Sequence, residues 1–209
     1  MPTTPRPQRA AKAHQAEIWA QLILRSRDAA AIRGFLRDAG VDDRFIVRRM
    51  HLTVYHARRP MPGLWPMREA AAVLLSAADT RFMLLAPGGE NPRSDLDPSV
   101  APVGIRVRRA SEAFDGLLGY RRRFFPHETR RVLGRRAPSS RRASAFGARC
   151  FQPHIALLRR GHGLGVPLDE MGRRFRSFFR EPFLFDGFLV DVVAPAGRAA
   201  TAAGRDRLG

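Results

Sequence analysis

Two strand-like segments, each with one histidine, constrain what this chain can fold into. They run from Arg48 to Ala57 and from Phe151 to Arg160, and a loop rich in Pro and Gly follows the first. Strand side chains alternate between two faces. The predicted histidine faces carry His51, Thr53 and Tyr55 in the first segment and His154 and Ala156 in the second. We expect the two strands to meet across one cleft and the histidines to work as a pair.

The opposite faces of these segments are mostly apolar. They carry Leu52, Val54 and His56 in the first segment and Ile155 and Leu157 in the second. His56 is therefore interpreted as structural. Tyr55 is a candidate substrate-binding residue, because the alternation places it on the face of His51, although a packing role for its ring is the alternative.

Composition indicates a globular protein. The chain has 209 residues and is 44% hydrophobic, enough for one domain or two small lobes with a core. Its one cysteine, Cys150, can form no disulfide within the chain, which favours a reducing, cytoplasmic location. No apolar run approaches the roughly 20 residues of a membrane span. We interpret residues 1–13 as a disordered basic tail, 14–193 as the folded domain and 194–209 as a second disordered tail.

The charge is strongly unbalanced. Lys and Arg number 37 against 19 Asp and Glu, for a formal net charge of +18. Arginine binds phosphate through a planar fork of donors, so nucleic acid or nucleotides are the expected partners. The alternative is a solvated basic surface in an Arg-rich proteome. The most basic segment, Arg121 to Arg149, is equally consistent with an electrostatic role beside a phosphate site and with a solvated loop.

Periodicity and capping residues predict the other elements. A further strand is expected to begin at Phe45 and to lead, through a bend, into the first histidine segment. Predicted helices cover 14–25, 28–40 with Asp28 as a cap, 67–78, 111–120 and 168–179. Predicted strands cover 81–86, 100–108 and 183–193.

Two histidines that face one another across a groove form a general acid–base pair. One can be neutral and the other protonated at the same pH, because imidazole titrates near pH 6.5. Such a pair suits phosphodiester cleavage, in which one histidine takes a proton from the attacking group and the other gives one to the leaving oxygen. The hydroxyl of Thr53 can donate to a phosphate oxygen. This scheme needs no metal and no cofactor.

The paired segments resemble the two-histidine (2H) phosphoesterase superfamily, in particular its 2′-5′ RNA ligase-like branch of RNA 2′,3′-cyclic phosphodiesterases. The run His51-Leu52-Thr53-Val54 is similar to the first family motif in full, and Pro153-His154-Ile155-Ala156-Leu157 is similar to the second in its context. The resemblance covers roughly residues 18–193. It implies a bilobal α+β fold, with two antiparallel sheets related by pseudo-twofold symmetry around a central cleft and helices on the outside.

The sequence departs from the family pattern at Ala156, where the second motif normally carries Thr or Ser. A methyl group cannot donate to phosphate, so one expected hydroxyl is missing. Losing one such donor costs on the order of a few kcal/mol of transition-state stabilisation. The candidates to replace it, or to bind substrate elsewhere, are Arg106, Arg149, Arg159 and Arg160.

Two hypotheses follow. The first is a monomeric, metal-independent hydrolase that acts on a cyclic phosphate or a 2′-5′ phosphodiester in RNA or a nucleotide, with His51 and His154 as acid and base in either order. The second is a non-catalytic RNA- or nucleotide-binding module on the same scaffold, in which arginines supply the affinity and binding weakens with salt. Neither involves a membrane.

Overall fold

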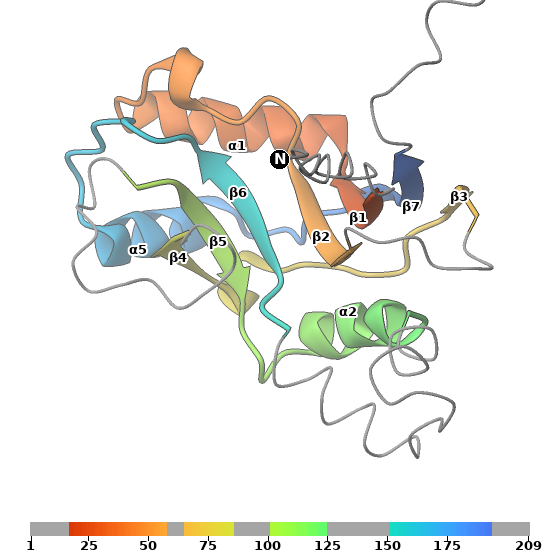
Figure 1. Cartoon of the computed structure of the whole chain (residues 1–209). Coiled ribbons are helices and arrows are strands. Elements are labelled where there is room, and N and C mark those ends of the chain that lie inside the picture. The colour runs from red at the N-terminus through yellow and green to blue at the C-terminus, as the bar shows by residue number, and fades with distance from the viewer. Residues whose placement is uncertain (1–16, 58–64, 86–100, 125–150, 194–209) are drawn as a thin grey trace, which may run out of the picture.

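A computed structural model describes residues 17–57, 65–85, 101–124 and 151–193. Within them the chain forms one seven-stranded antiparallel sheet and three α-helices, so the predicted α+β class is confirmed at this level (Figure 1). The strand order is β3-β7-β1-β2-β6-β5-β4. The strands are β1 (Glu17–Leu24), β2 (His51–Ala57), β3 (Met67–Glu69), β4 (Thr80–Leu84), β5 (Val103–Val107), β6 (His154–Leu158) and β7 (Phe185–Val193). The helices are α1 (Ser26–Asp38), α2 (Glu112–Arg122) and α5 (Leu168–Phe178).

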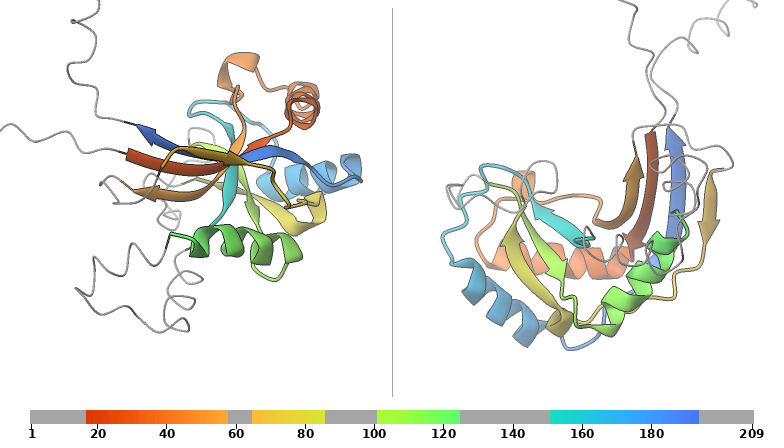
Figure 2. Two further views of the ribbon diagram at one scale, coloured as in Figure 1. Left: turned by 90° about the vertical axis from the view of Figure 1, so that its right-hand side faces the viewer. Right: turned by 60° about the horizontal axis from the view of Figure 1, so that its bottom comes forward.

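The two histidine strands, β2 and β6, are neighbours at the middle of the sheet. They pair through Leu52 and Ile155, and this one residue pair joins four strands on one side to three on the other. Beyond it β6 pairs with the segment before β2, where Ile46 bridges Leu158. The strands β3, β7, β1 and β2 are inclined to β6, β5 and β4, so the sheet bends at its centre (Figure 2).

One face of the sheet is buried under the helices. Its central row crosses four strands and consists of Leu52, Ile155, Ile105 and Phe82. Phe175 of α5 packs edge-on against Phe82 and against Phe35 of α1. At the other end of the sheet, Tyr120 of α2 packs on Phe188 of β7, with ring centroids 4.6 Å apart. The histidine strands therefore have a closed apolar side, and their other side carries the polar residues.

Two predicted helices are wrong. Residues 14–25 were expected to be helical because Ile18 and Leu22 lie four positions apart, but the segment forms β1. Its buried residues recur at every second position, namely Ile18, Ala20, Leu22 and Leu24. The Ala-rich run 67–78 was also expected to be helical, but it forms the short strand β3 and then an extended segment in which Leu75 pairs with Phe183. Tertiary pairing outweighs the helix propensity of alanine in this run.

Apart from the strand expected to begin at Phe45, the remaining predicted helices and strands are present within a few residues of their expected ends. Helix α1 starts earlier than expected, at Ser26, and Asp28 lies in its first turn. The carboxylate of Asp28 does not cap the helix but accepts a hydrogen bond from the backbone N–H of Leu184 (2.8 Å). Gly40 follows α1 with φ +86°, as its predicted role in ending the helix requires. The strand expected to begin at Phe45 is instead a 3₁₀ turn over Asp43–Phe45, followed by the bridge at Ile46.

Both predicted tails lie outside the described residues. Within the described part of the chain, every helix is too short or too polar to cross a lipid bilayer.

Candidate active site

The site is built on the residues that flank the central pair of Leu52 and Ile155. Both of these side chains are fully buried in the core face. Because side chains alternate along a strand, the residues on either side of each point to the opposite face. That face carries His51 and Thr53 from β2 and His154 and Ala156 from β6, all four only partly buried.

Cross-strand register arranges these residues in two rows. β2 and β6 are antiparallel, so Thr53 lies on the same side of the central pair as His154, and His51 lies on the same side as Ala156. On β5, Arg106 is the partner of His154 and Gly104 is the partner of Ala156. The two histidines therefore occupy diagonal corners of a small square on adjacent strands. Thr53 and Ala156 occupy the other two corners.

Each imidazole is held by the same kind of hydrogen bond. His51 Nδ1 lies 3.2 Å from the carbonyl oxygen of Arg49, and His154 Nδ1 lies 3.0 Å from the carbonyl oxygen of Gln152. A carbonyl oxygen can only accept, so Nδ1 must carry the proton in both rings. In the neutral ring Nε2 then carries the lone pair, and in the charged ring it carries the transferable proton. Both rings are thus oriented to exchange protons through Nε2.

The environment favours the neutral form of His51. Burial is the main cause and lowers the pKa of His51 from its ordinary value of 6.5. The bond to the Arg49 carbonyl opposes this shift, while the positive charges of Arg49 and of protonated His154 add to it. A charge on His154 therefore lowers the pKa of His51, and this coupling suits a pair in which His51 is the base and His154 the acid.

A bulge in β2 changes which residues share this face. In the pairing with β1, Thr53 lies opposite Gln21 and Tyr55 lies opposite Ala20, so Val54 is an extra residue without a β1 partner. The expected alternation is correct up to Thr53 and wrong after it. Tyr55 turns into the core and is only 2% exposed, and its ring stacks on Phe124 with centroids 4.7 Å apart. Of the two roles considered for Tyr55, the structure shows packing and not substrate binding.

His56 takes the place that was expected for Tyr55. It lies opposite Trp19 on β1, and the two rings stack with centroids 3.8 Å apart. Trp19 shares its face with Gln21, whose Nε2 donates to Asp191 Oδ2 on β7 (3.1 Å). Sequence reasoning missed that Trp19, His56 and Asp191 lie on the same face of the sheet as the histidine pair. The one available signal in the sequence was Trp19, a large aromatic residue between the buried residues Ile18 and Ala20.

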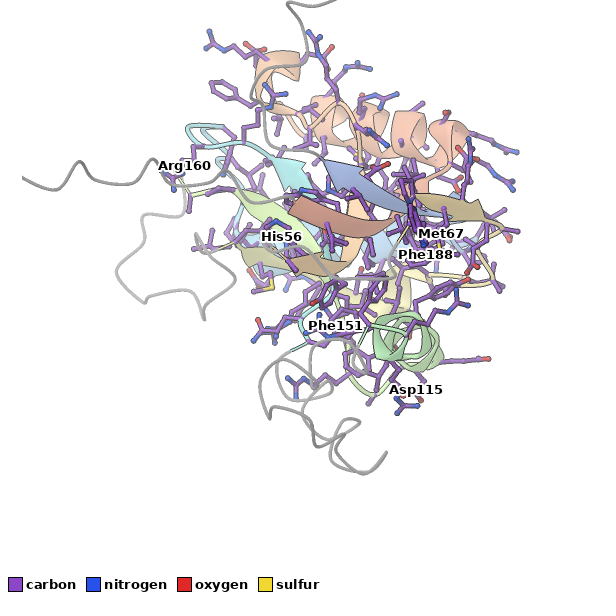
Figure 3. The ribbon with its side chains drawn as sticks, turned by 45° about the vertical axis from the view of Figure 1, so that its right-hand side comes forward. His56, Met67, Asp115, Phe151, Arg160 and Phe188 are labelled. Carbon is purple, nitrogen blue, oxygen red and sulfur yellow. The ribbon has the colours of Figure 1, made fainter. Side chains whose placement is uncertain are left out.

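The four candidate arginines are placed differently. Arg106 lies beside His154 on the site face. Arg159 and Arg160 are exposed beyond the end of β6, in a turn where Gly161 has φ +74°. Phe151 and Arg160, on either side of β6, lie far apart in Figure 3. Arg149 lies outside the described residues, as does most of the Arg-rich segment that starts at Arg121.

Among the residues that the structure describes, no group of three or more His, Cys, Asp or Glu side chains is arranged to hold a metal ion. Compared with protein-family models and with curated proteins, the sequence matches none of them.

Proposed function

We propose that this protein is a phosphoesterase of the two-histidine type, which hydrolyses a cyclic phosphate or a 2′-5′ phosphodiester in RNA or a nucleotide. The observation that carries the proposal is the arrangement of His51 and His154. They lie on adjacent strands, on the same face, and each has Nδ1 against the backbone carbonyl oxygen two residues earlier. Two imidazoles on one face of the sheet, held in the same tautomer, support acid–base catalysis at a phosphorus atom.

The proposed reaction transfers two protons. His51 Nε2 takes a proton from water as the water oxygen attacks phosphorus, and the P–O bond to one ribose oxygen breaks. His154 Nε2 gives its proton to that oxygen. Thr53 donates its hydroxyl hydrogen to a non-bridging phosphate oxygen. The pair ends in the opposite protonation state and returns to the start by exchange with solvent, so the side chains supply every proton transfer without a metal.

The rings on the site face support a nucleotide as the substrate. Trp19 and His56 form a stacked pair beyond Thr53, on the side away from β6. Nucleobases stack on aromatic side chains, whichever base they are. A phosphate held between the two histidines would leave the base of the same nucleotide within reach of this pair. Asp191, next to it, can accept a hydrogen bond from a base N–H.

The bend at the centre of the sheet supports the expected bilobal arrangement with pseudo-twofold symmetry. We propose that β3-β7-β1-β2 and β6-β5-β4 act as two lobes, related by an approximate twofold axis between the histidine strands. Each group contributes one histidine from the strand at its inner edge. We also propose that the protein acts as a monomer. A location in the reducing cytoplasm is proposed because the single cysteine can form no disulfide within the chain.

The test is turnover of adenosine 2′,3′-cyclic phosphate in the presence of EDTA. Wild type should open the ring, and His51→Ala and His154→Ala should each lose about 10²- to 10⁴-fold in kcat. Arg173→Met, on the exposed side of α5, is the control and should keep full activity. Unchanged melting temperatures would show that the variants are folded. If both alanine variants keep wild-type rates, the assignment fails.

Ala156 favours a second candidate function, a non-catalytic binding module. The corner of the square occupied by Ala156 has no hydroxyl, which removes one donor from the proposed phosphate site. This candidate predicts no turnover of any cyclic or 2′-5′ substrate by wild type. It also predicts binding of oligonucleotides that weakens steeply with salt.

A further inference from the structure

Arginines gather on the side of His154 that faces away from β2. Arg106 on β5 is the cross-strand partner of His154, and Arg81 on β4 is the cross-strand partner of Arg106. Since cross-strand partners share a face, both side chains extend from the face that carries the histidine pair. Thr53, His154, Arg106 and Arg81 thus form one row across four strands.

The spacing of this row follows from the sheet. Neighbouring strands lie about 4.8 Å apart, so the backbone of Arg106 is about 5 Å and that of Arg81 about 10 Å from the backbone of His154. The reacting phosphate of the proposed function lies between His51 and His154, on the side of His154 that faces β2. Arg81 lies two strands away from His154 in the opposite direction, so an anion held by Arg106 and Arg81 together is a different group from the one that reacts.

The charges in this row lack a balancing carboxylate. Within residues 17–57, 65–85, 101–124 and 151–193, neither Arg106 nor Arg81 forms an ion pair with Asp or Glu. Partial burial is the main cause that lowers the pKa of Arg106, and the charges of Arg81 and Arg109 lower it further. Neighbouring guanidinium groups that repel one another bind an anion favourably, and phosphate matches their planar fork.

We propose that Arg106 and Arg81 form an anion subsite beside His154, which binds a second phosphate of the substrate. The substrate class is then a nucleotide that carries at least one phosphate besides the reacting one, such as an oligonucleotide end or a 5′-phosphorylated nucleotide. This inference rests on the proposed function for the identity of the reacting group, but the anion subsite can be measured without turnover.

The test compares adenosine 2′-monophosphate with adenosine 2′,5′-bisphosphate by isothermal titration calorimetry. Wild type should bind the bisphosphate at least about tenfold more tightly, the usual size of one additional charge-assisted contact. Arg106→Met should bind both ligands with equal affinity. Arg81 is exposed and can be replaced without disturbing the core. The variant Arg81→Met should therefore lose part of the preference for the bisphosphate. Arg173→Met removes the same charge from α5 and should keep the wild-type preference.

Salt provides a second readout. Salt screens the attraction between a guanidinium group and a phosphate. The affinity of wild type for the bisphosphate should therefore fall more steeply with salt than its affinity for the monophosphate, and this difference should shrink in Arg106→Met and remain in Arg173→Met. Equal affinity of wild type for the two ligands would overturn the subsite, and so would a preference that survives in both Arg106→Met and Arg81→Met.

The two proposals fail separately. If wild type prefers the bisphosphate through Arg106 but opens no cyclic phosphate, the subsite stands and the phosphoesterase assignment fails. If wild type opens adenosine 2′,3′-cyclic phosphate, but a 5′-phosphate changes neither kcat/KM nor affinity, the assignment stands and the subsite fails.

Discussion

Leu52 on β2 lies directly opposite Ile155 on β6, and both side chains are completely buried. Within the described residues this is the one residue pair between β2 and β6, and the bridge between Ile46 and Leu158 extends the link between the two halves of the sheet. The same two residues fix the positions of the proposed catalytic groups, since His51 and His154 are their immediate neighbours. Packing at this pair therefore determines both the stability of the fold and the alignment of the histidines.

Leu52→Ala should destabilise the protein by about 2–5 kcal/mol, because it removes a fully buried side chain and leaves a cavity. Urea denaturation at neutral pH measures the loss. Leu74→Ala is the matched control, since Leu74 is 58% exposed and should change the free energy of unfolding by less than about 0.5 kcal/mol. In Leu52→Ala, kcat should fall further than the folded fraction does. A kcat that follows only the folded fraction would contradict the positioning role.

The pH dependence of kcat/KM should reflect the lowered pKa of His51. A base acts in its deprotonated form, and a lowered pKa keeps it deprotonated at more acidic pH. The midpoint of the acidic limb should therefore lie below the ordinary imidazole value of 6.5. Arg49→Met removes a positive charge that lowers this pKa, so the limb should move to higher pH. Arg48→Met serves as the control and should leave the limb in place. A wild-type limb centred above pH 6.5 would exclude His51 as the base.

Ala156→Thr should raise kcat, because it supplies the missing hydroxyl at the corner of the square beside His51 and Gly104. One phosphate donor is worth on the order of a hundredfold in established sites, so a gain of at least about tenfold is expected. Ala156→Val is the control, since valine has nearly the shape of threonine without the hydroxyl. A gain in both variants would point to packing, and a loss in both would show that this corner must remain small.

Trp19→Ala should weaken the binding of nucleotide substrates specifically. Stacking of one base on an aromatic ring is worth about 1–3 kcal/mol, which corresponds to a rise of roughly tenfold or more in KM. The variant should hydrolyse glycerol 1,2-cyclic phosphate, which has no base, at the wild-type rate. Equal losses on both substrates would assign Trp19 to folding, and melting temperatures would check that interpretation.

Sequence patterns were sufficient to predict the parts of the fold that depend on local periodicity. The histidine strands, helices α2 and α5 and strands β4, β5 and β7 all follow from the spacing of apolar residues together with the length of each segment. The segment of β1 was misassigned because Ile18 and Leu22 satisfy both the helical and the strand period. The run after Met67 was misassigned because its pairing with β7 is a long-range contact that local propensity does not contain.

The site was predictable only in part, for the same reason. Alternation correctly grouped His51 with Thr53 and His154 with Ala156, because each group flanks one buried residue. The other neighbours of the histidines depend on the register between strands. That Arg106 is the partner of His154 depends on how β5 aligns with β6, and no local pattern specifies that alignment. Nothing in the residue types around Val54 marks a bulge either, since no glycine or proline is present there.

The extra residue at Val54 determines which changes β2 can accept during evolution. The part of the strand up to Thr53 carries groups suited to a ligand, and the part from Tyr55 onward begins with a ring that is held against Phe124. Deleting Val54 would restore regular alternation and leave Tyr55 opposite Ala20 and His56 opposite Trp19, so the phenol ring would stay inside and the imidazole on the site face. A deletion of one residue elsewhere in β2 would instead move the side chains beyond it to the wrong face. Alignments of related chains should therefore show one-residue length differences at position 54 sooner than elsewhere in the strand.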